Sequence, residues 1–326
     1  MIALPPLDVR DLRTTLFTRR GELKAVDGLS LTVGAGETVA LVGESGCGKS
    51  LTALSIMRLL PDPPARVVGG EVRLNGRDIV ALTEEDMLAV RGQEIGMIFQ
   101  DPMSALNPVA TVEKQIVEVL RAHTDLPRRA ARERARELLE LVGMPDAARR
   151  LDEYPHRLSG GMCQRVVIAM AIACRPAVLI ADEPTTALDV TVQAQVLALL
   201  KRLQADAGMA MVFITHDLGV VAETADRVVV MYAGRKVEEA PIDDLFERPL
   251  HPYTVGLIGA TPTPGAARAE RLADIAGMVP SLGDLPPGCA FAPRCKRAME
   301  RCRQEKPPLT EPAPGRLVAC FSPEGS

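Results

Sequence analysis

At 326 residues the chain is long enough for one large domain or two smaller ones, and its apolar fraction of 47% is typical of a globular protein. The net charge of −4, without a long basic tract or any Trp, argues against nucleic acid as a partner. The sequence has no run of about 18 apolar residues and no signal-peptide pattern at its start. We therefore expect a cytosolic protein that reaches a membrane only through a partner.

The N-terminal region is expected to form strands. Residues 7–10 and 29–33 alternate apolar and polar side chains, which is typical of strands with one buried face. Phe17 lies between them and is one of only six phenylalanines. Its ring can stack on an adenine base, or it can be a packed or loop phenylalanine, and the sequence weights the two interpretations equally.

Residues 43–50 match G-x-x-x-x-G-K-S/T, the phosphate-binding loop of nucleotide-hydrolysing proteins. An apolar run at 38–42 predicts a buried strand before the loop, and residues 51–60 predict a helix that Pro61 ends. A strand, a glycine-rich loop and a helix in that order direct backbone N–H groups and the helix dipole at an anion. The loop residues are Gly43, Glu44, Ser45, Gly46, Cys47, Gly48, Lys49 and Ser50.

Each residue type in this loop has a chemical reason. The glycines let the backbone bend sharply and approach phosphate without a Cβ in the way. Lys49 is a mobile positive charge that can bridge oxygens of the β- and γ-phosphates. The hydroxyl of Ser50 can ligate Mg²⁺. An ordinary glycine-rich turn is the alternative, and the complete match after a predicted strand disfavours it.

The next strand predicted from an apolar run covers residues 95–99 and ends at Gln100. If that strand end faces the nucleotide, the Gln100 amide can reach Mg²⁺ or the attacking water. Residues 101–160 then change from strand patterns to helical ones, with apolar side chains at helix spacing over 112–120 and 128–141. This change predicts a helical insert in an α/β domain.

Residues 158–162 predict the start of another helix. Ser159 is a good N-cap, and Gly160 and Gly161 expose the N–H groups of the first turn, which makes a second potential phosphate site. From composition alone, a helix that simply begins with glycines is the commoner interpretation.

Residues 177–183 form an apolar run that predicts a buried parallel strand ending in two acids. Asp182 can hold Mg²⁺ directly or through water, and Glu183 can polarise a water for attack on the γ-phosphate. A helix is predicted from about 191 to 207, and a strand at 211–215 ends at His216. His216 can hydrogen-bond the γ-phosphate if it faces the same site, or it can be structural.

Together these residues resemble one family, the ATP-binding subunits of ABC transporters. Residues 43–50 resemble its Walker A motif and 179–183 its Walker B motif. Residues 158–162 resemble the signature that separates the family from other phosphate-loop ATPases, although Met162 stands where many members have Gln. Gln100, Asp189 and His216 fall where the Q-loop, D-loop and H-loop residues would.

The resemblance implies an ATPase that binds ATP and Mg²⁺. It implies ATP contacts from Phe17, Gly43, Glu44, Ser45, Gly46, Cys47, Gly48, Lys49, Ser50, Leu51, Gln100, Ser159, Gly160, Gly161, Asp182 and Asp189. It implies Mg²⁺ ligands at Ser50, Gln100 and Asp182, and catalytic roles for Lys49, Gln100, Glu183 and His216.

The implied fold is α/β, a phosphate-loop core with a RecA-like mixed sheet and an antiparallel β subdomain. The ATP-binding domain would cover residues 1–250, with a helical subdomain at about 101–175.

The sequence also shows a narrower resemblance, to the oligopeptide/dipeptide/nickel importers. Residues 100–108 resemble the Q-loop of that group. His251-Pro252-Tyr253-Thr254 resembles the start of their C-terminal extension, here a Cys-rich segment at 251–326, and locally predicts a turn into a helix.

In that group two ATP-binding domains pair head to tail, and each ATP lies between one phosphate loop and the opposite signature. The resemblance thus implies a second ATP-binding subunit, of a paralogous chain, and two transmembrane permease subunits, with a substrate-binding protein as an indirect partner. It places the chain peripherally on the cytoplasmic face of the bacterial inner membrane, driving import of di- or oligopeptides or of nickel by closure of the ATPase dimer.

Four cysteines crowd the last forty residues in a C-x5-C-x6-C-x17-C spacing among many prolines: Cys289, Cys295, Cys302 and Cys320. A segment with so little core usually needs a staple. Disulfides are disfavoured in the cytosol. The spacing leaves four-thiolate zinc and a 4Fe–4S cluster about even. The resemblance favours the iron–sulfur cluster, because this importer group can carry one in the extension.

Two rival functions remain at this point. A soluble ABC-type ATPase of DNA repair or translation would typically carry coiled-coil insertions or two cassettes, whereas this sequence shows one cassette and no sustained heptads. A soluble ATPase whose iron–sulfur tail senses redox state is the other rival.

Overall fold

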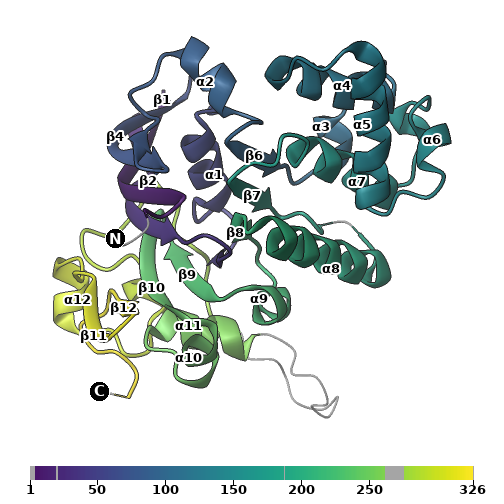
Figure 1. Cartoon of the computed structure of the whole chain (residues 1–326). Coiled ribbons are helices and arrows are strands. Elements are labelled where there is room, and N and C mark those ends of the chain that lie inside the picture. The colour runs from purple at the N-terminus through teal and green to yellow at the C-terminus, as the bar shows by residue number, and fades with distance from the viewer. Residues whose placement is uncertain (1–3, 20, 187, 261–274, 326) are drawn as a thin grey trace. The chain divides into compact units, whose positions relative to one another are not determined.

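The computed structural model of the protein describes residues 4–19, 21–186, 188–260 and 275–325 (Figure 1). The chain divides into two compact units. The first unit comprises Met1–Leu7, Val33–Glu37 and Leu74–Phe213, and the second comprises Asp8–Thr32, Thr38–Arg73 and Ile214–Ser326. The predicted C-terminal extension at 251–326 includes residues 261–274 and 326, which lie outside the described part of the chain.

The first unit contains short, fully buried strands. β6 (Ile95–Ile98) pairs in parallel with β7 (Val178–Asp182), and β8 (Ala210–Ile214) is the other neighbour of β7. Every residue of these three strands is buried. Burial on both faces explains why each strand is a continuous apolar run in the sequence rather than an alternating one.

The predicted helices between 101 and 175 are present, and Figure 1 shows them as one group in teal. α5 packs against α4, α6 and α7, and the apolar positions of α4 and α5 that the periodicity selects are buried. The helices of this unit are α2 (Glu84–Val90), α3 (Pro102–Ala105), α4 (Val112–His123), α5 (Arg128–Leu141), α6 (Ala147–Arg150), η1 (Pro155–Arg157), α7 (Gly160–Ala171) and α8 (Val190–Ala207); β5 is Arg77–Asp78.

The second unit contains a mixed sheet, as predicted. β3 runs parallel to β9, whereas β9, β10, β12 and β11 follow one another as antiparallel neighbours. In another sheet β1 lies between β2 and β4. The strands are β1 (Leu7–Thr18), β2 (Gly21–Val33), β3 (Thr38–Val42), β4 (Ala65–Leu74), β9 (Arg227–Tyr232), β10 (Arg235–Pro241), β11 (Thr310–Ala313) and β12 (Arg316–Val318).

The first helix of this unit ends earlier than the sequence predicted. α1 runs over Lys49–Met57, and Arg58 closes it in the left-handed conformation with φ of 52°. The prediction that the helix continues to residue 60 and stops at Pro61 is therefore wrong, because a left-handed residue already ends the helix. The other helices are α9 (Leu218–Thr224), α10 (Ile242–Glu247), α11 (Pro252–Gly259), η2 (Ala292–Arg294) and α12 (Glu300–Gln304).

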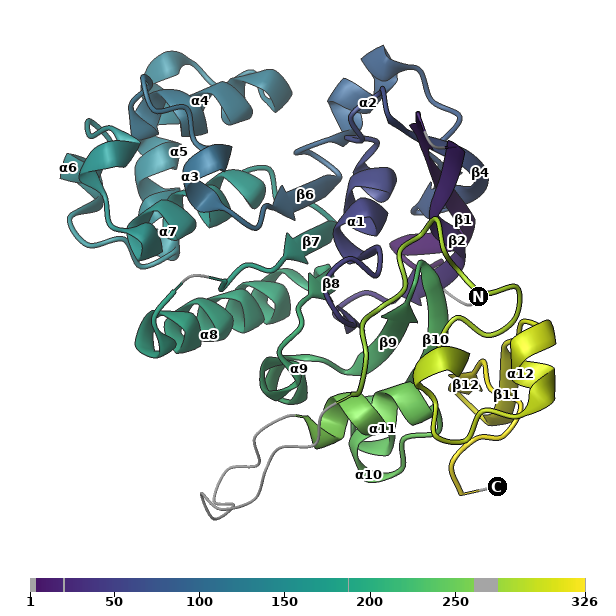
Figure 2. The same ribbon diagram turned by 180° about the vertical axis from the view of Figure 1, so that it is seen from behind.

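The C-terminal elements join the body of the second unit in two ways. Figure 2 shows β11, β12 and α12 beside β10, where β12 extends the sheet. An aromatic cluster of Tyr232, Tyr253 and Phe291 lies between β9, α11 and the segment before η2. Its ring centroids are 4.7 to 5.4 Å apart, in edge or tilted arrangements that aromatic pairs prefer.

Within the described residues, helices that combine the length and the apolar character needed to cross a bilayer are not found.

The start of α11 carries a buried titratable group. His251 is 1% exposed, and its Nδ1 accepts a hydrogen bond from the backbone N–H of Tyr253 at 3.0 Å. The backbone N–H of His251 donates to the carboxylate of buried Glu238 at 2.8 Å. Burial lowers the pKa of His251 to about 4, so the imidazole stays neutral in the folded protein near neutral pH.

We predict that His251 makes the protein less stable in mild acid. The unfolded chain takes up the proton near pH 6.5 and the folded chain only near pH 4, so up to about 3 kcal/mol of unfolding free energy is lost as pH falls through that window. His251→Asn keeps an N-cap acceptor but cannot titrate, and Glu238 is common to both proteins. Chemical denaturation at pH 7 and pH 4 should show wild type losing about 3 kcal/mol relative to the variant. A constant difference between the two proteins would refute the assignment.

Candidate functional site

The phosphate loop between β3 and α1 is seated tightly against its own unit. Gly43 and Gly48 have φ of 150° and 104°. A Cβ on Gly43 would lie 2.3 Å from the carbonyl oxygen of Met231, and one on Gly48 would lie 2.5 Å from that of Ala25. Glycine is thus required at both positions by the protein's own backbone. At Gly46, with φ of 79°, a Cβ would meet nothing within 4 Å.

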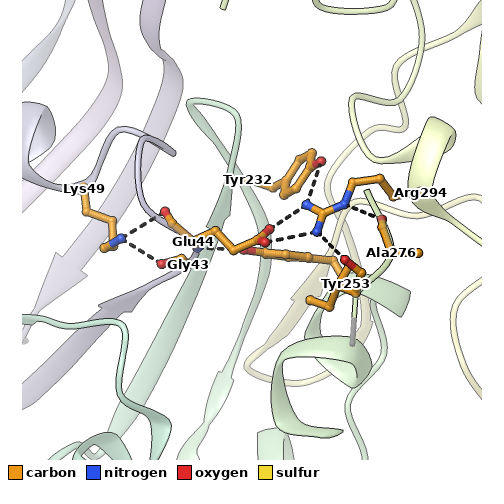
Figure 3. A network of polar contacts seen from close by, with 8 residues as sticks. Gly43, Glu44, Lys49, Tyr232, Tyr253, Ala276 and Arg294 are labelled. Atoms are coloured by element: carbon orange, nitrogen blue, oxygen red, sulfur yellow. Dashed lines mark hydrogen bonds and ion pairs between the residues drawn. The ribbon is translucent and has the colours of Figure 1, made fainter. Parts of the chain in front are cut away.

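Lys49 is held at the loop. Lys49 is only 5% exposed. Its Nζ donates to the carbonyl oxygens of Gly43 at 2.7 Å and Glu44 at 3.2 Å (Figure 3). A buried ammonium needs such acceptors. The positive charge is therefore already placed where the loop would receive a phosphate.

Cys47 is not a reactive nucleophile. It is fully buried, and burial raises the pKa of its thiol despite the nearby charge of Lys49. A protonated, inaccessible thiol is inert. Its role is to pack under the loop, where a Cβ on Gly43 would come within 2.8 Å of its sulfur.

Phe17 lies near the end of β1 and is 42% exposed, and its backbone N–H donates to the carbonyl of Pro64 at 2.7 Å. The ring is not part of the core. An exposed ring is what stacking on a base requires, and this role stays a prediction.

In the first unit the structure brings Gln100 and Glu183 together. Gln100 Nε2 donates to Glu183 Oε2 at 2.9 Å, and the hydroxyl of Thr186 donates to the same oxygen at 2.9 Å. Glu183 has φ of 46°, an uncommon conformation for a residue with a side chain, at the point where β7 ends. Two donors thus orient the carboxylate that the sequence singled out as a base.

Thr186 was missed by the sequence analysis. It is the second of two consecutive threonines after the acid pair, and nothing in the sequence singles out its hydroxyl. Asp182, in contrast, is where it was expected, as the buried last residue of β7.

The glycine-flanked helix start lies on the surface of the first unit. Ser159 caps α7, its Oγ accepting from the N–H of Met162 at 3.4 Å, and both Ser159 and Gly160 are exposed. A Cβ on Gly160 would meet open space, whereas one on Gly161 would lie 2.7 Å from a methyl group of Val192 in α8. The exposed turn can receive an anion, and Gly161 is also required for packing.

Asp189 and His216 both adjoin helix starts. Asp189 caps α8, where its carboxylate accepts from the N–H of Val192 at 2.9 Å. His216 is exposed and precedes Asp217, which caps α9. The structure thus shows Asp189 as the N-cap of α8, and its contact with nucleotide stays a prediction.

The candidate Mg²⁺ ligands are Ser50, Gln100 and Asp182, which offer hydroxyl, amide and carboxylate oxygens. This donor set fits Mg²⁺, which prefers hard oxygen ligands. Ser50, the phosphate loop and His216 belong to the second unit, and the first unit contains Gln100, Ser159, Asp182, Glu183 and Asp189.

The four C-terminal cysteines, Cys289, Cys295, Cys302 and Cys320, line one cavity of about 20 Å³ in the second unit. All four are free thiols. Burial raises the pKa of Cys289, Cys295 and Cys320, and the proximity of the other thiols raises it further. Among the described residues, no three His, Cys, Asp or Glu side chains converge as metal ligands. Four thiols are a donor set that thiophilic metals prefer.

Two family models match the sequence. One, described as ABC transporter, matches residues 26–186, and the other, described as Oligopeptide/dipeptide transporter, C-terminal region, matches residues 237–302.

Named relatives match nearly the whole chain. The peptide import ATP-binding protein BMEII0863 of Brucella melitensis is 55% identical to this chain. The match covers 94% of this chain and 93% of the relative. The oligopeptide transport ATP-binding protein AppD of Bacillus subtilis is 51% identical over 97% of this chain and 96% of its own.

A solved structure of the ATP-binding cassette MJ0796, a dimer in a post-hydrolysis state with ADP and phosphate, is 28% identical. It covers 72% of this chain and 98% of its own length with a TM-score of 0.66.

We predict unequal costs for alanine in the loop. Gly43→Ala meets a backbone oxygen and should lower the unfolding free energy by more than about 2 kcal/mol. Gly46→Ala meets nothing and should cost about 1 kcal/mol, from its left-handed φ alone. Chemical denaturation of the two variants tests this difference, and equal losses would show that the close approach to Met231 does not decide the conformation.

Proposed function

This chain belongs to the ATP-binding subunits of oligopeptide and dipeptide ABC transporters, and we propose that it powers the import of di- or oligopeptides by ATP-driven closure of an ATPase dimer. It is an ATPase, and the observation that carries the proposal is the phosphate loop with Lys49 held in it, on a chain more than half identical to a relative named for peptide import. Nickel, the cargo of some members of the importer group, is the alternative substrate.

We propose the following division of labour at the ATP. Lys49 and the N–H groups of residues 43 and 45–51, Leu51 included, hold the β- and γ-phosphates, and Phe17 stacks on the adenine. The N–H of Glu44 already donates to the hydroxyl of Tyr253. The oxygens of Ser50, Gln100 and Asp182 would hold Mg²⁺, which when bound neutralises charge on the phosphates.

Glu183 would be the base that takes a proton from the attacking water. Its Oε2 accepts hydrogen bonds from Gln100 and Thr186, which hold the carboxylate in one orientation. His216 would donate to the γ-phosphate as charge develops there. This hydrogen bond supports a second task for Gln100, which would be to orient the base.

Dimer closure is proposed from the exposed start of α7. Ser159, Gly160 and Gly161 would bind the γ-phosphate of the ATP held by a second, paralogous subunit, with Asp189 nearby at the start of α8. The support is that Ser159 and Gly160 are exposed on the surface of their own unit. ATP would then favour the closed dimer by binding it more tightly than the open one.

The proposed membrane partners are two permease subunits, with a substrate-binding protein as an indirect partner and the cytoplasmic face of the bacterial inner membrane as the location. Apolar side chains around Gln100 and α3 are exposed, among them Phe99 at 37%, Met103 at 47% and Val109 at 81%. An exposed apolar patch of this kind is typical of a protein contact.

We propose two domains for the chain. The ATP-binding domain would cover residues 1–250, with a helical subdomain at about 101–175, and the C-terminal extension would cover 251–326.

A 4Fe–4S cluster is proposed for the cysteine-lined cavity, with Zn²⁺ as the alternative. The support is that all four thiols of the segment reach one cavity. A bound cluster would staple a segment with little core of its own, and Cys289, Cys295, Cys302 and Cys320 would be its ligands as thiolates.

We predict that Glu183→Gln separates binding from hydrolysis. The amide keeps the hydrogen bonding of the site but cannot accept the proton, so kcat should fall by about 100-fold or more while ATP still binds. Lys49→Ala should lose ATP binding itself, because it removes the charge that meets the phosphates. ATP binding, hydrolysis and size-exclusion chromatography with Mg-ATP check both variants. A Glu183→Gln protein that hydrolyses ATP at the wild-type rate, or that stays monomeric with ATP and its partner subunit, would contradict the proposal.

We predict that anaerobically purified protein is brown and contains iron and sulfide. Cys295→Ser with Cys302→Ser should remove the iron and the visible absorption, because a cluster needs its thiolates. Cys174→Ser is the matched control, since that cysteine lies outside the cavity. Colourless protein containing zinc, or iron that survives the double substitution, would rule the cluster out.

A further inference from the structure

The C-terminal extension reaches the phosphate loop at Glu44, the second residue of the motif. The backbone N–H of Glu44 donates to the hydroxyl of Tyr253 at 2.8 Å. Its carboxylate accepts two hydrogen bonds from Arg294, at 2.6 Å from Nη1 and 3.0 Å from Nη2 (Figure 3). Its carbonyl oxygen accepts from Lys49 at 3.2 Å. Every polar group of this residue is therefore engaged, two of them by residues more than 200 positions away.

Arg294 is itself fixed. Its side chain is 4% exposed, Nε donates to the carbonyl of Ala276 at 3.0 Å, and Nη2 donates to that of Ile275 at 2.9 Å. Nη1 also lies 3.4 Å from the hydroxyl of Tyr232. A planar guanidinium that is bound on several sides presents its remaining donors in one direction, here toward Glu44.

Tyr253 is equally well placed. It is fully buried in the aromatic cluster, with its ring 4.7 Å from that of Tyr232. Burial raises the pKa of its hydroxyl, so that the group stays neutral and can accept the N–H of Glu44. Packing in the aromatic cluster fixes the position of Tyr253, and the hydrogen bond to its hydroxyl in turn positions the backbone of Glu44.

The charge of Glu44 explains what this arrangement achieves. A carboxylate in a phosphate loop repels the triphosphate and can attract the ammonium of Lys49, which is already bonded to the carbonyl of the same residue. The bidentate pair with Arg294 neutralises the carboxylate and turns it to the side of the loop away from Lys49 (Figure 3). Lys49 is then left to the phosphates.

We infer that Arg294 and Tyr253 are positioning residues for ATP, acting through Glu44 to keep the phosphate loop in its binding conformation. The inference rests on the ATPase activity described above and gives the C-terminal extension a direct part in it. Neither residue touches the nucleotide in this scheme.

The test measures ATP affinity, KM, kcat and the unfolding midpoint of the full chain. Arg294→Met keeps the bulk of the side chain but leaves Glu44 unpaired, and it should raise KM and the Kd for ATP about tenfold with kcat changed less than about threefold. Adding Glu44→Gln to Arg294→Met removes the unpaired charge and should restore most of the affinity. Arg294→Lys, which keeps the charge but not the fork, should lie between.

Controls separate positioning from folding. Arg297→Met is the matched control. In the described part of the chain, the guanidinium of Arg297 bonds to Glu324, Ser322 and Pro323 rather than to the loop, so the KM of this variant should equal that of wild type. Tyr253→Phe removes only the hydroxyl and should raise KM about threefold, and it decides the question if Arg294→Met does not fold.

Unchanged KM in Arg294→Met or, where that protein is unfolded, in Tyr253→Phe would overturn the inference. So would a loss of affinity that Glu44→Gln does not relieve, because that loss would be structural rather than electrostatic. A wild-type chain that binds no ATP would instead contradict the proposed function. Failure of the positioning role can therefore be distinguished from failure of the proposed function.

Discussion

The phosphate loop depends on backbone-to-backbone contacts that leave no room for a side chain. Gly43 and Gly48 approach carbonyl oxygens of β9 and β2 so closely that a Cβ would overlap them. These contacts fix where the loop turns, and with it where α1 begins and where Lys49 points. Catalytic chemistry at the γ-phosphate requires placement to a fraction of an ångström, and a loop pressed against two strands supplies such rigidity.

Local patterns in the sequence predicted the elements that are governed by local forces. The strand at 38–42 was predicted with its observed limits, because both of its faces are buried and its residues form one apolar run. The predicted end of α1 was wrong, because nothing in the amino-acid composition indicates that Arg58 adopts the left-handed conformation. The sequence placed Gln100 and Glu183 at strand ends, but it predicted neither the hydrogen bond between them nor that of the Thr186 hydroxyl to the same oxygen.

The network around Glu44 lay beyond such reasoning for a physical reason. Arg294 and Glu44 are 250 residues apart, and neither lies in a periodic pattern that would place it against the other. In the sequence, the arginines near the C-terminal cysteines differ in no visible way from one another. In the structure they differ in burial and in the partners they bind. Arg294 is almost fully buried and bidentate, and Arg301 is an exposed residue paired with Glu305. Burial, which a single sequence states only indirectly, separates the two.

The separation of 250 residues between Glu44 and Arg294 also sets an order of events during synthesis. A nascent chain exposes its phosphate-binding motif early, but the guanidinium that neutralises Glu44 leaves the ribosome only with the last part of the polypeptide. Nucleotide capture at full strength is thereby delayed until translation is nearly finished. Chains broken off before the final segment would carry an intact motif and still compete poorly for ATP.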